Sequence, residues 1–257
     1  MVLYNNKMEG LGIRKPFARQ GGKSRLADII VKKFPVNYEN LKYIEPFAGG
    51  ASIYFYKKPS KVEVLNDLDP KVYTLLKGFK NFDGNNISNK LNNIPSTKEN
   101  FKRILDSKPT TEYDKFIRLL YLTKNSFFSR MQTHSGGRSP KTNYGSKYTD
   151  RLLDTIISNK SYEELIKEHD GPNTLFYFDP PYEASKGIYE NYVIDYVKMN
   201  KLLEHIKGKF ILSINSNPEF LKIFKNFKVE TVKTLYIAGR SGSKNKKTAT
   251  EYIFKNY

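Results

Sequence analysis

The sequence predicts an α/β fold, in which a mainly parallel, doubly wound sheet ends in an antiparallel hairpin and carries a mainly helical insert. Two stretches of the chain alternate short apolar strands with amphipathic helices, an order typical of parallel sheets. Between them, helical periodicities are separated by polar, Asn-rich stretches, and no strand is expected. The predicted division is an α/β domain of residues 1–80 and 168–257 with an inserted helical subdomain of residues 81–167.

The first α/β stretch begins with the apolar strand 41–47, which runs into Gly49-Gly50 and is followed by a helix at 51–58. Segment 61–67 alternates apolar with charged residues, as a half-buried strand does, and ends on a carboxylate. Pro70 then marks the first turn of the next helix, because proline is well tolerated there.

In the insert, segment 112–125 has helical periodicity. Its predicted buried face consists of Phe116, Leu119, Leu120 and Thr123. The second α/β stretch predicts, in chain order, a strand at 173–178, a helix at 195–208, a strand at 209–215, a helix at 217–227 and strands at 229–237 and 248–254. The last two strands flank a basic Gly/Ser loop, so an antiparallel hairpin is expected.

Composition narrows the function classes. The formal net charge is +18, from 44 Lys and Arg against 26 Asp and Glu, and such an excess favours a polyanionic partner. A Lys-rich, solvated surface would give the same charge. The chain has no cysteine, which excludes disulfides, thiolate zinc sites and cysteine nucleophiles. The three histidines lie far apart, so no metal site is expected.

No apolar run approaches the ~20 residues that cross a bilayer. The first ten residues, "MVLYNNKMEG", also lack the apolar core of a signal peptide. A soluble, intracellular protein is therefore expected.

The segment "RQGGKS" at 19–24 looks like the end of a phosphate-binding loop. That loop needs a glycine at the first position of G-x-x-x-x-G-K-S, where this chain has Phe17. No clear strand precedes the segment either, so a nucleotide-hydrolase loop is excluded. What remains is a Gly-Gly-Lys turn in front of a helix at 24–34.

A second glycine turn, Gly49-Gly50, follows a strand and opens a helix. Glycines there let a ligand approach the backbone N–H groups, although an ordinary strand-to-helix turn would look the same. Asp67 ends the next strand roughly 20 residues later, where nucleoside-binding folds place the acid that binds the ribose. The nearby Asp69 is expected to cap the helix that starts at Pro70.

The stretch "LFYFDPPY" at 175–182 is a buried strand that stops at Asp179-Pro180-Pro181-Tyr182. Consecutive prolines cannot continue a strand ladder, and they fix the directions of the carbonyl groups around them. A carboxylate, rigid carbonyls and an aromatic ring together suit a planar group with an exocyclic amine. The alternative is a rigid turn with a surface tyrosine.

The order of these features resembles the Dam-type N6-adenine DNA methyltransferases of the alpha group: a Gly-Gly-Lys turn, "EPFAGGAS" at 45–52, a strand-ending acid, an insert and "DPPY". The resemblance covers most of the chain. It implies a Rossmann-like, S-adenosylmethionine-dependent methyltransferase sheet, with the insert as the target-recognition subdomain. It further implies methyl transfer from S-adenosylmethionine to the N6 amine of an adenine flipped out of duplex DNA. That reaction requires neither a metal nor a covalent intermediate.

Carried onto this sequence, the resemblance implies two groups of site residues. The cofactor-binding residues would be Gly22, Lys23, Glu45, Phe47, Ala48, Gly49, Gly50, Asp67 and Asp179. The catalytic residues would be Asp179, Pro180, Pro181 and Tyr182. Asp179 and the Pro180 carbonyl would accept hydrogen bonds from the adenine amine, and Tyr182 would stack on the base.

Basic residues gather in two further segments. One lies in the insert and also carries polar and aromatic side chains, a mixture that suits phosphates and bases. Its candidate DNA-binding residues are Arg130, Gln132, Arg138, Lys141, Tyr144 and Lys147. The other is the hairpin loop with Arg240, Lys244, Lys246 and Lys247, for which a solvated turn is the alternative. The expected partner is double-stranded DNA, bound by a monomer or weak homodimer, with a restriction–modification pair as one context.

Two departures from the family pattern limit this interpretation. Arg19 stands where relatives place an aromatic residue, and the usual aromatic-Asn-Gly recognition turn is replaced by "SFFSRMQTHSGGR" at 126–138. No target sequence can therefore be carried over. The alternatives are methylation of cytosine N4 or of adenine in RNA, and a nucleic-acid-binding subunit that has lost catalysis.

Overall fold

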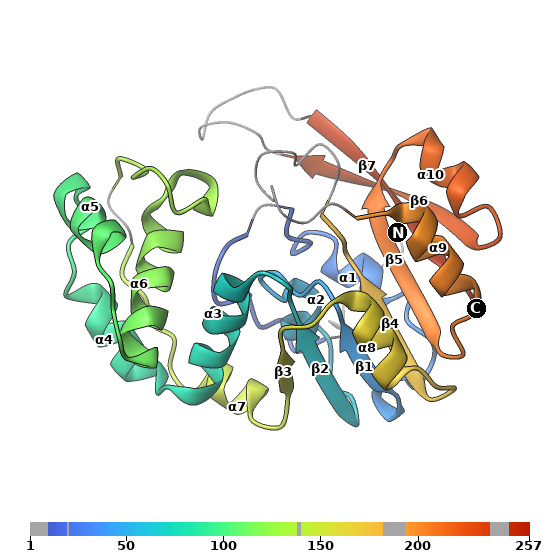
Figure 1. The fold of residues 1–257 in the computed structure, drawn as a ribbon, viewed down its shortest axis with the longest axis horizontal. Coiled ribbons are helices and arrows are strands. Elements are labelled where there is room, and N and C mark those ends of the chain that lie inside the picture. Colours follow the sequence, from blue (N-terminus) through green and yellow to red (C-terminus); the bar gives the residue numbers. More distant parts are fainter. Residues whose placement is uncertain (1–9, 20, 138–139, 182–193, 237–246) are drawn as a thin grey trace, which may run out of the picture.

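The structure is a computed structural model that describes residues 10–19, 21–137, 140–181, 194–236 and 247–257. A seven-stranded sheet with the order β3-β2-β1-β4-β5-β7-β6 forms its centre (Figure 1). The strands are β1 (Lys42–Glu45), β2 (Val62–Asn66), β3 (Ile156–Ser158), β4 (Thr174–Phe178), β5 (Lys209–Asn215), β6 (Lys228–Tyr236) and β7 (Lys247–Lys255). β1 to β5 pair in parallel and β7 is antiparallel to β5 and β6, which confirms the predicted sheet and hairpin.

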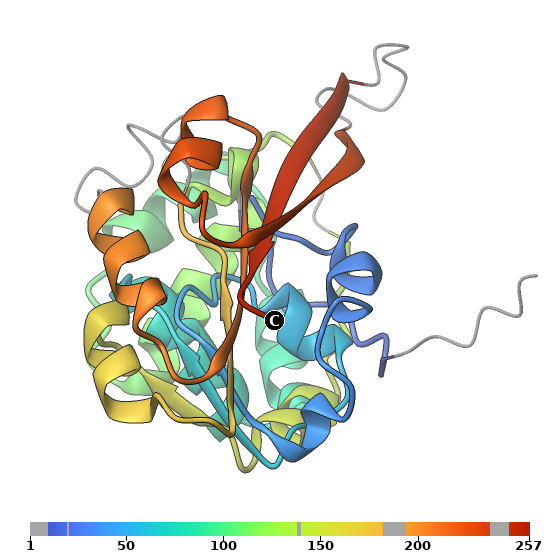
Figure 2. The ribbon, with the colours of Figure 1, turned by 90° about the vertical axis from the view of Figure 1, so that its right-hand side faces the viewer.

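Both faces of the sheet are buried, which explains why its central strands are almost continuously apolar. All five residues of β4 are buried. Alternate residues face two separate cores: Ile44 of β1 joins one, and its neighbour Tyr43 joins the other. Figure 2 shows the sheet between the two helical layers that cover these cores.

One layer contains α8 (Tyr162–His169), α9 (Tyr196–Glu204) and α10 (Pro218–Ile223). Residues of α1 (Ala27–Val31), α2 (Ser52–Tyr56) and α3 (Pro70–Asn81) belong to the core on the other side of the sheet. The Asp69 carboxylate accepts a hydrogen bond from the Lys71 N–H at the start of α3, so its predicted capping role is confirmed. A short 3-10 helix, η1 (Tyr38–Asn40), precedes β1.

The helical part of the insert extends the core beside α3 (Figure 1). It consists of α4 (Gly84–Asn92), α5 (Lys98–Asp106), α6 (Glu112–Asn125), η2 (Phe127–Ser129) and α7 (Lys147–Leu152). The predicted face of α6 is buried. α6 packs so closely on α3 that a Cβ atom at Gly78 would lie 2.0 Å from the ring of Phe116; glycine at this position permits the contact.

A buried ionic network joins this insert to the sheet. Arg151 of α7 pairs with Glu63 of β2, and Lys57 after α2 lies 2.5 Å from the same carboxylate. The Lys57 side chain is fully buried, and an uncompensated charge at that depth is costly. Arg151 therefore stabilises the fold through this buried ion pair.

The prediction of a strand-free insert is wrong at one place. β3 lies at 156–158 and pairs in parallel with β2, so the sheet extends into the segment assigned to the insert. Sequence periodicity missed it because the strand has three residues, none of which is fully buried. Within the described residues, no helix is both long and apolar enough to cross a membrane.

Candidate active site

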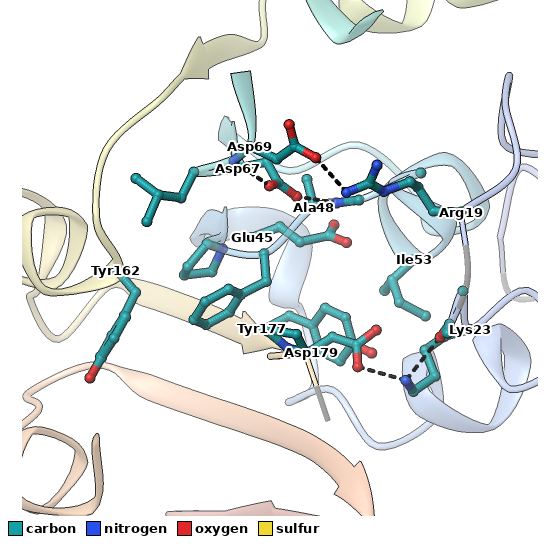
Figure 3. Close-up of a pocket in the computed structure, with 18 of the residues that line it drawn as sticks. Arg19, Lys23, Glu45, Ala48, Ile53, Asp67, Asp69, Tyr162, Tyr177 and Asp179 are labelled. Atoms are coloured by element: carbon teal, nitrogen blue, oxygen red, sulfur yellow. Dashed lines mark hydrogen bonds and ion pairs between the residues drawn. The ribbon is translucent and has the colours of Figure 1, made fainter. Parts of the chain in front are cut away.

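A pocket of about 320 Å³ lies beyond the carboxyl ends of β1, β2 and β4 (Figure 3). Ligands of open α/β sheets bind at this edge, because the loops there leave a crevice between neighbouring strands. The pocket is lined by the 19–23 turn, the segments that follow β1, β2, β3 and β4, and the first residues of α2.

The glycine turn after β1 forms one wall. Gly49 has a φ of +50°, in the region that favours glycine, and its N–H points to the Asp67 carboxylate at 2.8 Å. A Cβ atom at Gly50 would lie 2.9 Å from both the Phe17 carbonyl oxygen and Lys15 Cδ. Gly49 is therefore favoured by its positive φ. Gly50 is favoured because residues 15 and 17 lie too close for a side chain.

The loop after β2, residues 67–69, presents two carboxylates and is called the acid loop below. The Asp67 side chain accepts hydrogen bonds from the N–H groups of Gly49 and Asp69. Burial raises the pKa of Asp67 to about 6, and these N–H groups together with the charge of Arg19 oppose the rise. The loop thus holds an acceptor at the edge of the sheet.

Asn66 at the end of β2 fixes the positions of the loops around the pocket. Its fully buried side chain donates to the carbonyl oxygens of Pro46 and Lys160, and it accepts from the Lys160 N–H at 2.8 Å. The turns after β1 and β3 are therefore tied to the same side chain. Sequence analysis did not single out this asparagine, because nothing local distinguishes it from a polar strand end.

Asp179, which follows β4, forms the opposite end of the pocket (Figure 3). Lys23 Nζ lies 2.6 Å from Asp179 Oδ1 and 3.7 Å from the Glu251 carboxylate, and the Lys23 side chain is only 2% exposed. Ser213 Oγ also donates to Asp179, at 3.4 Å. Burial raises the pKa of Asp179, while the neighbouring ammonium group of Lys23 lowers it.

Glu45, the last residue of β1, lies between these two ends in the lining of the pocket. It accepts a hydrogen bond from the Tyr43 hydroxyl at 3.0 Å, and burial raises its pKa to about 8. Glu45 therefore favours its protonated form more strongly than an exposed glutamate does.

Every residue predicted to bind the cofactor lines this one pocket. Pro181 lines it too, and Pro180 is buried directly after Asp179. Tyr182 lies outside the described residues. Several lining residues were not predicted: Arg19, Gly21, Ser52, Ile53, Leu68, Asp69, Lys160, Ser161, Tyr162, Glu163, Tyr177 and Ile194. The Ser161–Glu164 capping box at the start of α8 is the local signal that could have located one of these segments.

The predicted DNA-binding residues are not all surface residues. Arg130, Gln132, Lys141 and Lys147 are exposed. Tyr144 is buried, with its ring 5.0 Å from that of Phe79, so it belongs to the core and cannot present its face to a base. Arg138, Arg240, Lys244 and Lys246 lie outside the described residues, and of Lys247 only the backbone, in β7, is described.

Comparisons with known proteins agree with this geometry. Residues 20–237 match the family model of the D12 class N6 adenine-specific DNA methyltransferases. The Type II methyltransferase M.CviBI of Paramecium bursaria Chlorella virus NC1A is 22% identical over 84% of this chain and 89% of its own length. The Type II methyltransferase M.MjaIII of Methanocaldococcus jannaschii is 24% identical over 95% of this chain and 99% of its own length.

Among solved structures, the putative methyltransferase YhhF of Escherichia coli superimposes with a TM-score of 0.42 at 10% identity, covering 95% of this chain and 91% of that one. The family match spans most of the chain and includes every residue that lines the pocket except Arg19, which lies one residue before it. The chain is therefore a member of the D12 class of N6 adenine-specific DNA methyltransferases.

Proposed function

We propose that this adenine-specific DNA methyltransferase carries out methyl transfer in the pocket beyond β1, β2 and β4, with Asp179 as the residue that binds the adenine amine. The observation that carries the proposal is the shared pocket. The acid loop lies at one end and Asp179, paired with Lys23 at 2.6 Å, lies at the other. A nucleoside-like donor and an amine acceptor both find complementary groups there.

The residues present fit S-adenosylmethionine, which the family uses as its methyl donor. Asp67 has acceptor capacity left for ribose hydroxyls, and Gly49 and Gly50, which line the pocket, place no side chain in the way of the donor. Phe47 and Leu68 add apolar surface for a planar base. When bound, S-adenosylmethionine supplies an electrophilic methyl group on a sulfonium sulfur.

Asp179 would act on the acceptor. The lone pair of the adenine amine is delocalised into the ring, so the amine is a weak nucleophile. A carboxylate and the Pro180 carbonyl, accepting hydrogen bonds from the amine, favour the more tetrahedral geometry of the transition state. Lys23 keeps the Asp179 carboxylate charged and fixed in position, because it is buried against it. We assign Tyr182 to stacking on the base.

An adenine inside a duplex cannot reach such a pocket, so we propose that the base is flipped out of the helix. We assign target recognition to the insert of residues 81–167, where Arg130, Lys141 and Lys147 are exposed and available to phosphates. The two relatives described above are named Type II methyltransferases, which supports methylation of a specific DNA site by this chain as well. We propose that it acts as a monomer or weak homodimer.

The test is incubation with unmethylated DNA and S-adenosylmethionine, followed by nucleoside analysis and single-molecule sequencing. N6-methyladenine at one recurrent site is expected. N4-methylcytosine as the product, or no methylated nucleoside at all, would contradict the proposal. The Asp179→Ala variant should lose methyl transfer while largely keeping its fold. Near-normal turnover by that variant would show that Asp179 is not the amine-binding residue.

A further inference from the structure

Arg19 forms an ion pair across the rim of the pocket. Its Nη2 atom lies 2.6 Å from Asp69 Oδ2, and the two side chains are 14% and 15% exposed (Figure 3). The partners are 50 residues apart in the chain, and both line the pocket. The contact therefore connects the N-terminal segment to the acid loop directly beside the space that a ligand would fill.

Asp69 connects Arg19 to Asp67 through hydrogen bonds. One oxygen of Asp69 receives Arg19, and the other caps α3 through the Lys71 N–H at 2.9 Å. The backbone N–H of Asp69 donates to Asp67 Oδ1, also at 2.9 Å. Holding the Asp69 side chain from both sides thus fixes the N–H group that orients the Asp67 carboxylate.

Arg19 also balances the charge of the acid loop. Asp67 is desolvated and lies beside a second carboxylate, Asp69, which opposes its ionisation, while Arg19 favours it. The other charged groups that line the pocket lie elsewhere. Lys160 and Glu163, from the segment after β3 and from α8, are each engaged in an ion pair of their own. Glu45 and the pair of Lys23 with Asp179 complete the charged lining.

We propose that Arg19 is a positioning residue for the methyl donor, which holds the acid loop through Asp69 and so keeps Asp67 ionised and oriented toward the donor ribose. This inference rests on the proposed function, because it assumes that the pocket binds S-adenosylmethionine.

The test measures S-adenosylmethionine binding by calorimetry on the DNA-free protein between pH 5.5 and 9, for wild type, Arg19→Gln, Arg19→Lys and Asp69→Asn. Removing the cation that pairs with Asp69 and acts on Asp67 should raise the pKa of Asp67 by about one unit. Arg19→Gln should then bind about tenfold more weakly near neutral pH and recover as the pH rises. At saturating cofactor and high pH, its turnover should stay within about twofold of wild type, since Asp179 is untouched.

Arg19→Lys keeps the charge and should retain most of the affinity. Asp69→Asn keeps the helix cap but removes the competing carboxylate, so its binding profile should not shift toward higher pH. Arg103→Gln, an exposed arginine on α5, is the matched control and should bind like wild type. Melting temperatures of all variants should lie within a few degrees of one another.

An unchanged S-adenosylmethionine affinity in Arg19→Gln would overturn the proposal. So would an affinity that falls by the same factor at every pH, because the ionisation of Asp67 would then play no part in the loss. Neither result would affect the proposed function if wild type still binds the cofactor and forms N6-methyladenine. Failure of wild type to bind S-adenosylmethionine would instead overturn the proposed function.

Discussion

Replacing Lys23 by methionine should move the acidic limb of the pH–activity profile toward higher pH. Lys23 Nζ lies 2.6 Å from Asp179 Oδ1, and the two side chains are 2% and 18% exposed. Methionine has a similar length and suits a buried site, so the substitution removes the charge with little change in packing. The Asp179 carboxylate then loses its nearest cation.

The geometry sets the size of the effect. Two opposite charges 4 Å apart interact by about 4 kcal/mol at an effective dielectric constant of 20. Opposite charges at such distances lower carboxyl pKa values by about 1 to 3 units. Lys15, whose charge also acts on Asp179, remains in the variant and offsets part of the loss. We therefore expect the pKa of Asp179 to rise by about 1 to 2 units, or about 1.4 to 2.7 kcal/mol.

The sign follows from the wild-type protein, in which burial has already raised the pKa of Asp179. A further rise makes the ionised acceptor rarer at neutral pH, so kcat/KM should fall there, by up to about tenfold to hundredfold, and recover as the pH rises. Stability should follow the same direction. A carboxyl group whose folded pKa is raised contributes fully below its unfolded pKa and loses that contribution as the pH rises. The variant should therefore lose stability relative to wild type as the pH rises from the acid range toward neutrality.

The assay is single-turnover methyl transfer with labelled S-adenosylmethionine from pH 5.5 to 9.5, with cofactor affinity measured at every pH. Lys23→Arg keeps a cation and is the matched control, whose acidic limb should stay near that of wild type. If the profile of Lys23→Met is the wild-type profile multiplied by a constant, Lys23 does not act through the charge of Asp179. A shift toward lower pH would refute the reasoning outright.

Three further variants test other parts of the structure. Gly50→Ala should weaken S-adenosylmethionine binding in calorimetry by about tenfold or more, because its Cβ would lie 2.9 Å from a backbone carbonyl oxygen. Gly171→Ala, whose Cβ meets nothing within 4 Å, should bind normally. Lys57→Met should lower the free energy of unfolding in urea by about 1.5–3 kcal/mol, because it removes a charged hydrogen bond to Glu63 while Glu63 keeps Arg151; a change below about 1 kcal/mol would contradict this. Lys141→Ala and Lys147→Ala should each reduce the slope of log affinity against log salt for duplex DNA by about 0.9, and an unchanged slope would exclude that phosphate contact.

Much of the fold could be predicted because its signals are local. The apolar run that becomes β4 stops where two prolines prevent further pairing, and Asp69 precedes a proline at a helix start. β3 has no comparable signal. It has only three residues, of which the first is exposed and the other two are half-buried, so no apolar run marks it as a strand. Its position depends on pairing with β2, which is a tertiary contact.

The candidate site was predictable to the extent that chain order places strand ends at one edge of a parallel sheet. Contacts between distant segments were not predictable, because no spacing indicates that Lys23 meets Asp179 across 156 residues. Composition was misleading at Tyr144. An aromatic residue among basic ones suggests stacking on a base, but composition does not reveal which face of a loop is buried, and this ring packs against Phe79.

The basic residues of the segment "RQGGKS" meet the acids of both ends of the pocket. Arg19 pairs with Asp69 in the acid loop, and Lys23 pairs with Asp179 after β4. The two cations are separated by a turn in which Gly21 has a φ of +81°. The charges at both ends of the pocket are therefore balanced by cations from this one short segment.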